Sequence, residues 1–192
     1  MIRFSLKSPT DREKINKKCI LYLGILYFIA LIWIIVFKCN FNELLFVSNQ
    51  RSQTMWERLD YALSQPMFVA SINAIIKGKN PAEIVAFFFN VFGLIPIGMA
   101  FRFFFSRSRA CLLSFATVLC IEIFQLISCY GGFRLDDIVL NTLGALIGVI
   151  LTEKCIPKVK PELINRIARV LIYIAIPFDL FFIINTIIHF PG

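Results

Sequence analysis

The stretch Ala110–Cys129, ACLLSFATVLCIEIFQLISC, decides the fold class, because its 20 residues include a single charged side chain, Glu122. A helix of about 20 apolar residues covers the roughly 30 Å of hydrocarbon in a bilayer. The apolar residues run continuously and do not alternate with polar ones, which favours a helix over a strand of a membrane barrel. The stretch therefore predicts a transmembrane helix that carries one carboxylate.

Four further apolar runs lie on either side of this stretch: Cys19–Phe37, Ala82–Phe101, Asp136–Leu151 and Val170–Phe190. A mean hydropathy of +0.77 and a charged share of 17% leave too little polar surface for a soluble domain. We therefore expect an all-α, polytopic membrane helical bundle of about five transmembrane helices. Residues 1–18 are expected to form a basic cytoplasmic segment, and residues 19–192 a single membrane domain.

The basic residues predict the orientation of the bundle. If the N-terminus lies in the cytoplasm, 14 of the 20 Lys and Arg residues fall in cytoplasmic segments, as in most membrane proteins. The net charge of +8 is explained in this way, and the chain has no motif for binding nucleic acid. We expect a multi-pass protein of the cell membrane, with membrane lipids as its partners and no nucleic acid.

Residues 38–80 form the longest polar stretch, and the sequence leaves their role open. The piece Pro66–Ile76 is apolar but too short to span, which predicts an interfacial or re-entrant helix. Asn80-Pro81 then signals the start of a helix, since proline suits the first helical position.

The six cysteines form no CxxC pair and the chain has one histidine, so no metal site is predicted. Cys39 and Cys129 are both expected near the outer ends of helices. Two interpretations stay open for them, a disulfide and a pair of free thiols.

Polar side chains inside the apolar runs point to a site, because a charge near the bilayer centre costs about 3 kcal/mol or more. A helix rises 1.5 Å per residue, which places Asn90, Glu122 and Asn141 at similar depth in the outer half of the membrane. Gln125 shares a helix face with Glu122. The three helices therefore predict a shared polar pocket that opens towards the outside.

The fourth apolar run presents its polar residues and its glycines on one face. Asp137, Asn141, Gly144 and Gly148 follow one another at helical spacing, and the two glycines form a GxxxG pair that lets helices pack closely. The polar face is therefore expected to be the packed face.

Plainer interpretations stand beside the functional one. Asn90 and Asn141 are also explained as interhelical hydrogen bonds, and Asp136 as an acid favoured by a helix N-terminus. Arg134 either pairs with an acid across its turn or is solvated. Asp179 is expected to be local to the helix that Pro177 perturbs, outside the pocket.

Residues 82–151 resemble the VanZ-like family on three motifs taken together. The motifs are Asn90 with Pro96 and Gly98 along one helix, Glu122-x-x-Gln125, and Asp136-Asp137-x-x-x-Asn141-Thr142-x-Gly144-x-x-x-Gly148. The first run matches only loosely and the fifth lies outside the shared block. Many members carry another Asp where this chain has Arg134, which weighs against a role that needs three acids in that turn.

The resemblance implies a VanZ-like core over residues 82–151. It also implies a link to resistance against the glycopeptide teicoplanin in Gram-positive bacteria, the property associated with the founding member. It assigns neither a molecular activity nor a cofactor, and it leaves the oligomeric state open.

Three hypotheses follow for the function of the candidate residues. In the first, the pocket binds or remodels an amphiphile, such as a cell-wall lipid precursor or a lipid-tailed antibiotic. In the second, the protein is an enzyme acting on a lipid-linked substrate, with Glu122 as acid or base and Asp137 or the Asp136-Asp137 pair holding a cation. In the third, it is a transporter or a structural subunit. The candidate pocket comprises Asn90, Glu122, Gln125, Arg134, Asp136, Asp137 and Asn141, with Gly144 and Gly148 as packing residues.

Overall fold

The structure is a computed structural model that describes residues 15–31, 54–64, 68, 72, 76, 81–128 and 133–189. Within these ranges the chain forms helices and no strand, so the predicted all-α class is confirmed. The helices are α2 (Lys17–Leu31), α3 (Met55–Ser64), α5 (Pro81–Phe104), α6 (Arg107–Ser128), α7 (Leu135–Lys154), the 3-10 helix η2 (Ile156–Lys158) and α8 (Pro161–His189).

Three of the described helices are long and apolar enough to cross a membrane, and they lie where the second, third and fourth apolar runs predict them. The membrane-length stretches are Phe87–Phe104, Arg107–Ile127 and Leu135–Lys158. The total of five spans and the cytoplasmic N-terminus stay predictions. Helix α5 begins at Pro81, as the Asn80-Pro81 signal predicts.

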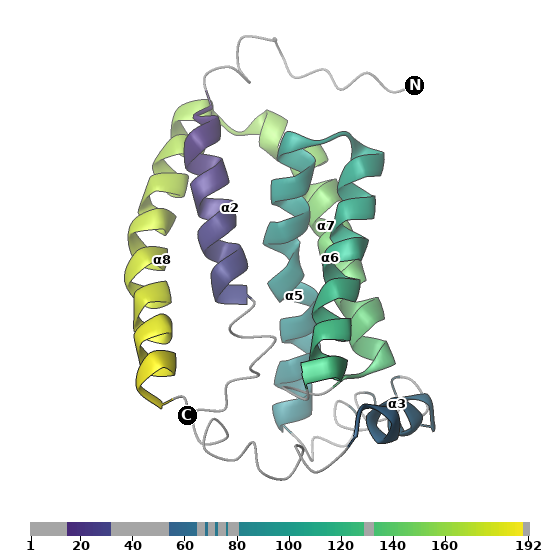
Figure 1. The fold of residues 1–192 in the computed structure, drawn as a ribbon. Helices are drawn as coiled ribbons and strands as arrows, with labels where there is room; N and C mark the ends of the chain where they lie inside the picture. Colours follow the sequence, from purple (N-terminus) through teal and green to yellow (C-terminus); the bar gives the residue numbers. More distant parts are fainter. Residues whose placement is uncertain are drawn as a thin grey trace.

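The long helices form two groups that α2 joins (Figure 1). Helix α7 packs against α5 and α6, while α8 packs against α2, and α2 also contacts α5. Helices α2, α6 and α8 run in one direction along the bundle, and α5 and α7 run in the other. The α5–α6 and α7–α8 connections therefore share one end with the starts of α2 and α8.

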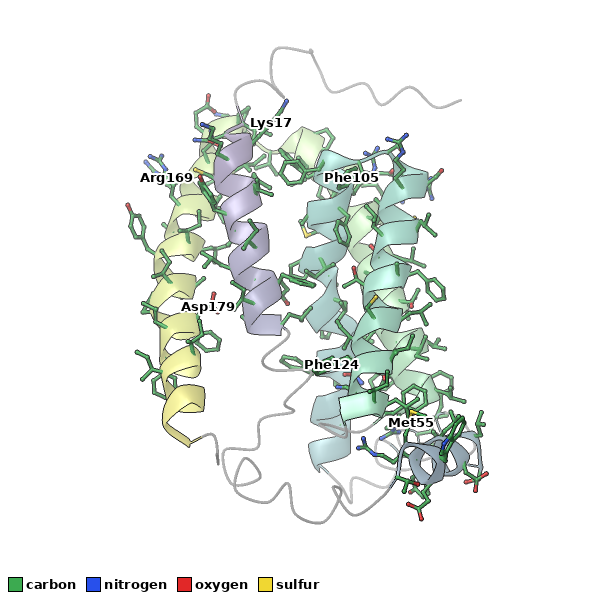
Figure 2. All side chains as sticks on the ribbon, in the orientation of Figure 1. Lys17, Met55, Phe105, Phe124, Arg169 and Asp179 are labelled. Atoms are coloured by element: carbon green, nitrogen blue, oxygen red, sulfur yellow. The ribbon has the colours of Figure 1, made fainter. Side chains whose placement is uncertain are left out.

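Basic residues gather at this end of the bundle. Lys17 and Arg169 lie towards this end of the bundle, as does Phe105 of the α5–α6 turn (Figure 2). Lys154 ends α7 and Lys158 ends η2 at the same end of the bundle. The helix directions thus bring together the charges that the sequence assigns to the cytoplasmic side.

The helices bury polar groups and expose apolar ones. Ten polar or charged side chains are buried within the described residues, whereas large apolar side chains such as Leu112 and Tyr173 are 67% and 76% exposed. Broad exposed apolar surface marks contact with a membrane or a partner. The apolar core itself is small and consists of Leu31, Leu94, Ile97, Val118, Ile121 and Ala145.

Glycines bring α5 and α7 into backbone contact. A Cβ atom added at Gly144 would overlap the carbonyl of Val91, and one at Gly148 would overlap the carbonyl of Ile95. A Cβ atom added at Gly98 of α5 would likewise overlap the carbonyl of Ala145 in α7. The GxxxG pair of α7 therefore packs as the sequence predicts, and the partner is α5.

Pro96 lies inside α5, one turn beyond a carbonyl that α2 contacts. Proline has no N–H, so Pro96 cannot donate to the carbonyl of Phe92, four residues earlier. The hydroxyl of Tyr27 donates a 2.5 Å hydrogen bond to the carbonyl of Gly93. This bond ties α2 to the turn of α5 that precedes Pro96.

Two predictions fall mainly outside the described residues. Only residues 68, 72 and 76 of Pro66–Ile76 are described, and neither Cys39 nor Cys129 is. The four described cysteines, Cys19, Cys111, Cys120 and Cys155, are free thiols.

Candidate functional site

The first turn of α7 carries the acid that binds α5. Arg134 is the N-cap residue, so Asp136 and Asp137 occupy the first turn, where the helix dipole favours negative charge. The side chain of Asn90 donates from Nδ2 to Oδ1 of Asp137 across 2.6 Å. Both side chains are buried, so this bond removes a polar pair from contact with lipid.

One turn further along α7, a second amide–carboxylate pair binds α6. Nδ2 of Asn141 donates to Oε1 of Glu122 at 3.2 Å, and the two residues are each 1% exposed. Since Asp137 and Asn141 are four residues apart, α7 presents both pairs on one face. The structure therefore brings Asn90 of α5 and Glu122 of α6 against the face of α7 that carries Asn141.

Gln125 lies one turn beyond Glu122 on α6 and is fully buried. Its backbone carbonyl accepts a 2.9 Å hydrogen bond from Nη1 of Arg58 in α3. Arg58 is itself buried, so α3, a segment for which the sequence predicts no helix, adds a buried guanidinium beside the end of α6.

A capping box is the signal that would have found α3. Thr54 precedes Glu57 by three residues, and each caps the other: the Thr54 backbone N–H donates to Glu57 Oε2 at 2.6 Å, and the Glu57 N–H donates to Thr54 Oγ1 at 3.3 Å. Arg58 and Ala62 then follow on one helix face and are buried.

Arg134 and Asp136 pair with each other. Nη2 and Nε of Arg134 donate to the two carboxylate oxygens of Asp136 at 2.6 and 3.2 Å, which is a two-point contact. Of the alternatives left open for Arg134, the structure shows pairing with an acid. This pair lies beside Asp137 in sequence, but its bonds run within the turn and not between helices.

We call Arg58, Asn90, Glu122, Gln125, Asp137 and Asn141 the polar cluster. Each is less than 10% exposed, and together they supply two carboxyl groups, one guanidinium and three amides. Oδ1 of Asn141 is buried and accepts no hydrogen bond from the described residues. The cluster thus contains both donors and acceptors at the junction of α3, α5, α6 and α7.

Comparison with known proteins assigns a family to the part of the chain that carries this cluster. A family model described as VanZ/LLP1 matches residues 24–156, which is more than half of the chain. The chain belongs to the VanZ/LLP1 family. The match covers all of α3, α5, α6 and α7 and ends before α8, in line with the sequence resemblance. Searches of curated proteins and of solved structures found no match.

Asp179 lies on α8, outside the VanZ/LLP1 match and outside the polar cluster. Its side chain is 4% exposed, and neither carboxylate oxygen accepts a hydrogen bond from a described residue. Because α8 packs against α2, Asp179 belongs to a separate part of the bundle (Figure 2). This agrees with the prediction that it stands apart.

The acids of the family core do not gather as metal ligands in the described part of the chain. No group of three or more His, Cys, Asp or Glu residues is found there. Asp136 accepts hydrogen bonds from Arg134 and Asp137 accepts one from Asn90, so the two adjacent carboxylates have different partners. This arrangement gives the cation hypothesis no support.

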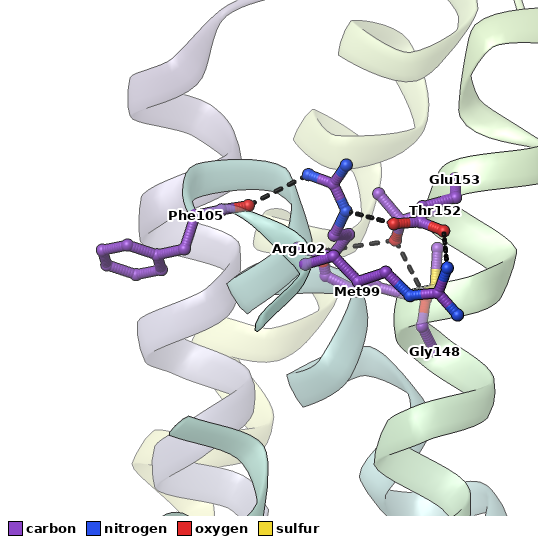
Figure 3. Close-up of polar contacts among 7 residues, drawn as sticks. Met99, Arg102, Phe105, Gly148, Thr152 and Glu153 are labelled. Carbon is purple, nitrogen blue, oxygen red and sulfur yellow. Dashed lines mark hydrogen bonds and ion pairs between the residues drawn. The ribbon is translucent and has the colours of Figure 1, made fainter. Parts of the chain in front are cut away.

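A second polar network at the opposite end of α5 and α7 was not predicted (Figure 3). Nε of Arg102 lies 2.7 Å from Oε1 of Glu153, and Nη1 of Arg107 lies 3.8 Å from Oε2. Thr152 donates to the carbonyl of Gly148 at 3.0 Å. Arg102 also donates to the carbonyl of Phe105, which closes the end of α5. The Arg102–Glu153 pair joins the ends of α5 and α7, and an arginine lies near each carboxylate oxygen of Glu153, so we assign this network to stability.

Proposed function

We propose that this VanZ-family membrane protein binds an amphiphile at the outer leaflet, and that the polar cluster holds the polar head of the ligand. The observation that carries the proposal is the pairing of Asn90 with Asp137 and of Asn141 with Glu122 between three membrane-length helices. Buried polar residues of this kind in a membrane most often serve a ligand or ion path. The family assignment favours a cell-wall lipid precursor or the glycopeptide teicoplanin as the ligand.

The chemistry of the cluster suits a head group with many hydroxyl and amide groups. Carboxylates accept hydrogen bonds from hydroxyl and amide donors, while asparagine and glutamine amides both donate and accept. Sugars and peptides of cell-wall precursors present both kinds of group. The exposed apolar sides of α5 and α6 offer a surface for the acyl chain of such a ligand.

The test compares acids inside and outside the cluster by the same carboxyl-to-amide exchange. Glu122→Gln and Asp137→Asn alter the cluster, whereas Asp179→Asn alters a buried acid on α8. We expect teicoplanin tolerance of a Gram-positive host expressing the chain to fall in the first two variants and to persist in the third. Protein levels in the membrane must be equal. Full tolerance in both cluster variants would end the proposal.

Binding itself is measured by native mass spectrometry of the purified protein. We expect a lipid or added teicoplanin to remain bound to the parent chain and to Asp179→Asn, and to be lost from Glu122→Gln. Equal retention by all three proteins would place the ligand elsewhere.

A membrane-embedded enzyme is the second candidate, and one observation favours it. Glu122 is buried and its carboxylate is oriented by the Asn141 amide, as a general base needs to be. Purified protein in lipid vesicles should then convert a labelled lipid-linked cell-wall precursor, and Glu122→Gln should abolish conversion. Binding without conversion would favour the first candidate.

A further inference from the structure

Helix α3 presents three different faces along its ten residues. Arg58 and Ala62, four residues apart, are buried against the bundle. Glu57, Asp60 and Ser64 follow at spacings of three and four residues and form an exposed polar stripe. Trp56 and Leu63 lie seven residues apart on the side between these two faces, and they are 71% and 63% exposed.

The exposed apolar side is unusual for a loop segment facing water. A tryptophan and a leucine on one face of this ten-residue helix form an apolar strip beside a polar one. Helices with this division lie in the plane of a membrane interface, with the apolar side at the boundary of head groups and acyl chains. Tryptophan in particular collects at that depth.

The position of α3 agrees with such a depth. It lies across the end of the bundle, next to the end of α6 (Figure 1), and α6 is the described helix that it contacts most closely. Phe124 and Ile127 in the last turns of α6 are 50% and 63% exposed, so the lipid-facing surface of the bundle extends to the level of α3. Figure 2 labels Phe124 of α6 and Met55 of α3 towards this end of the bundle.

The anchor of α3 fixes which side faces outwards. The hydrogen bond from Arg58 to the carbonyl of Gln125 holds the buried face on α6. With that face fixed, the polar stripe points away from the bundle towards water, and Trp56 and Leu63 point to the side.

We propose that α3 is an interfacial helix, and that its Trp56–Leu63 side docks into the head-group and upper acyl layer of the bilayer beside α6. The occupant of this apolar side is therefore lipid, and the helix covers the outward end of the polar cluster at the membrane surface. The contact of α3 with the bilayer does not depend on whether the polar cluster binds a ligand.

The chain has two tryptophans, which makes the test direct. In a Trp33→Phe chain reconstituted into phosphatidylcholine vesicles, Trp56 is the sole tryptophan, and its emission is excited selectively above the absorption of tyrosine. We expect lipids brominated high in the acyl chain to quench Trp56 more than lipids brominated near the methyl end, and aqueous iodide to quench it weakly. Strong iodide quenching without bromolipid quenching would overturn the proposal. Resistance to both quenchers would also overturn it, because a protein surface would then cover Trp56.

A matched pair of variants tests the side that docks. In the same background, Leu63→Asp should reduce quenching by bromolipid and increase quenching by iodide, whereas Ser64→Asp on the polar stripe should change neither. An equal effect of both substitutions would contradict the assigned face. If Leu63→Asp loses the elution profile of the parent chain on size exclusion, the depth measurement on Trp56 alone decides.

Discussion

Asn90 of α5 and Asp137 of α7 are joined by a 2.6 Å hydrogen bond in which the amide nitrogen donates to the carboxylate. The bond links two helices that also touch through glycines, so it lies in the tightest interface of the bundle. An amide held against a buried carboxylate reduces the cost of keeping the carboxylate out of water.

Removing that donor should destabilise the bundle. We expect Asn90→Ala to lower the free energy of unfolding by about 1–2 kcal/mol, the upper part of the range for interhelical hydrogen bonds in membranes. The measurement is unfolding of the purified protein in detergent by increasing sodium dodecyl sulfate. Phe92→Ala on the exposed side of α5 is the control and should change stability less. Equal losses in the two variants would show that the hydrogen bond contributes little.

Gly144 should not tolerate a methyl group. Alanine is the better helix former by about 1 kcal/mol, but here its Cβ would overlap the carbonyl of Val91 and force α5 and α7 apart. Overpacking of this kind costs about 1–3 kcal/mol, so Gly144→Ala should be destabilised in the same detergent titration. Gly24→Ala is the control, because its Cβ would meet Ala100 at an ordinary 3.7 Å. A gain of stability in both variants would refute the close contact.

The contacts that the sequence could predict are those encoded within one helix. The spacing of Asp137, Asn141, Gly144 and Gly148 defines one face, and depth counted along each helix brings Asn90 to the same level. Because the spacing and rise of a helix are regular, these predictions do not depend on how the helices pack. The partners across the interface, Asn90 for Asp137 and Glu122 for Asn141, depend on that packing and needed the structure.

Arg58 and Glu153 were missed for a different reason. Both lie in polar segments, where a charged residue is expected and gives no signal of burial. The capping residues Thr54 and Glu57 were the only local mark of α3, and the pairing of Glu153 with Arg102 arises from the way α5 and α7 end side by side.

Glu153 should contribute more to stability than Arg107, the more exposed of its two arginine neighbours. The Glu153 and Arg102 side chains are 10% and 13% exposed, so Glu153→Gln should cost about 1–3 kcal/mol by leaving Arg102 with a weaker acceptor. Arg107 is 67% exposed and 3.8 Å away, and Arg107→Ala should cost no more than about 0.5 kcal/mol. Thermal unfolding in detergent at low and high salt measures both. A larger loss in Arg107→Ala would reverse the assignment.

The cap of α3 should respond to acid through Glu57. The Thr54 backbone hydrogen bond, and then the Thr54 hydroxyl, lower the pKa of Glu57 below its ordinary value. The carboxylate therefore stabilises α3 fully above the pKa of a free glutamate, and this contribution is lost as the pH falls through the lowered pKa. In a Trp33→Phe chain, the emission anisotropy of Trp56 should fall over that acid range as the first turn of α3 frays. Glu57→Gln has no carboxyl group to titrate, so its anisotropy should lack this step. The same step in the variant would assign the change to another group.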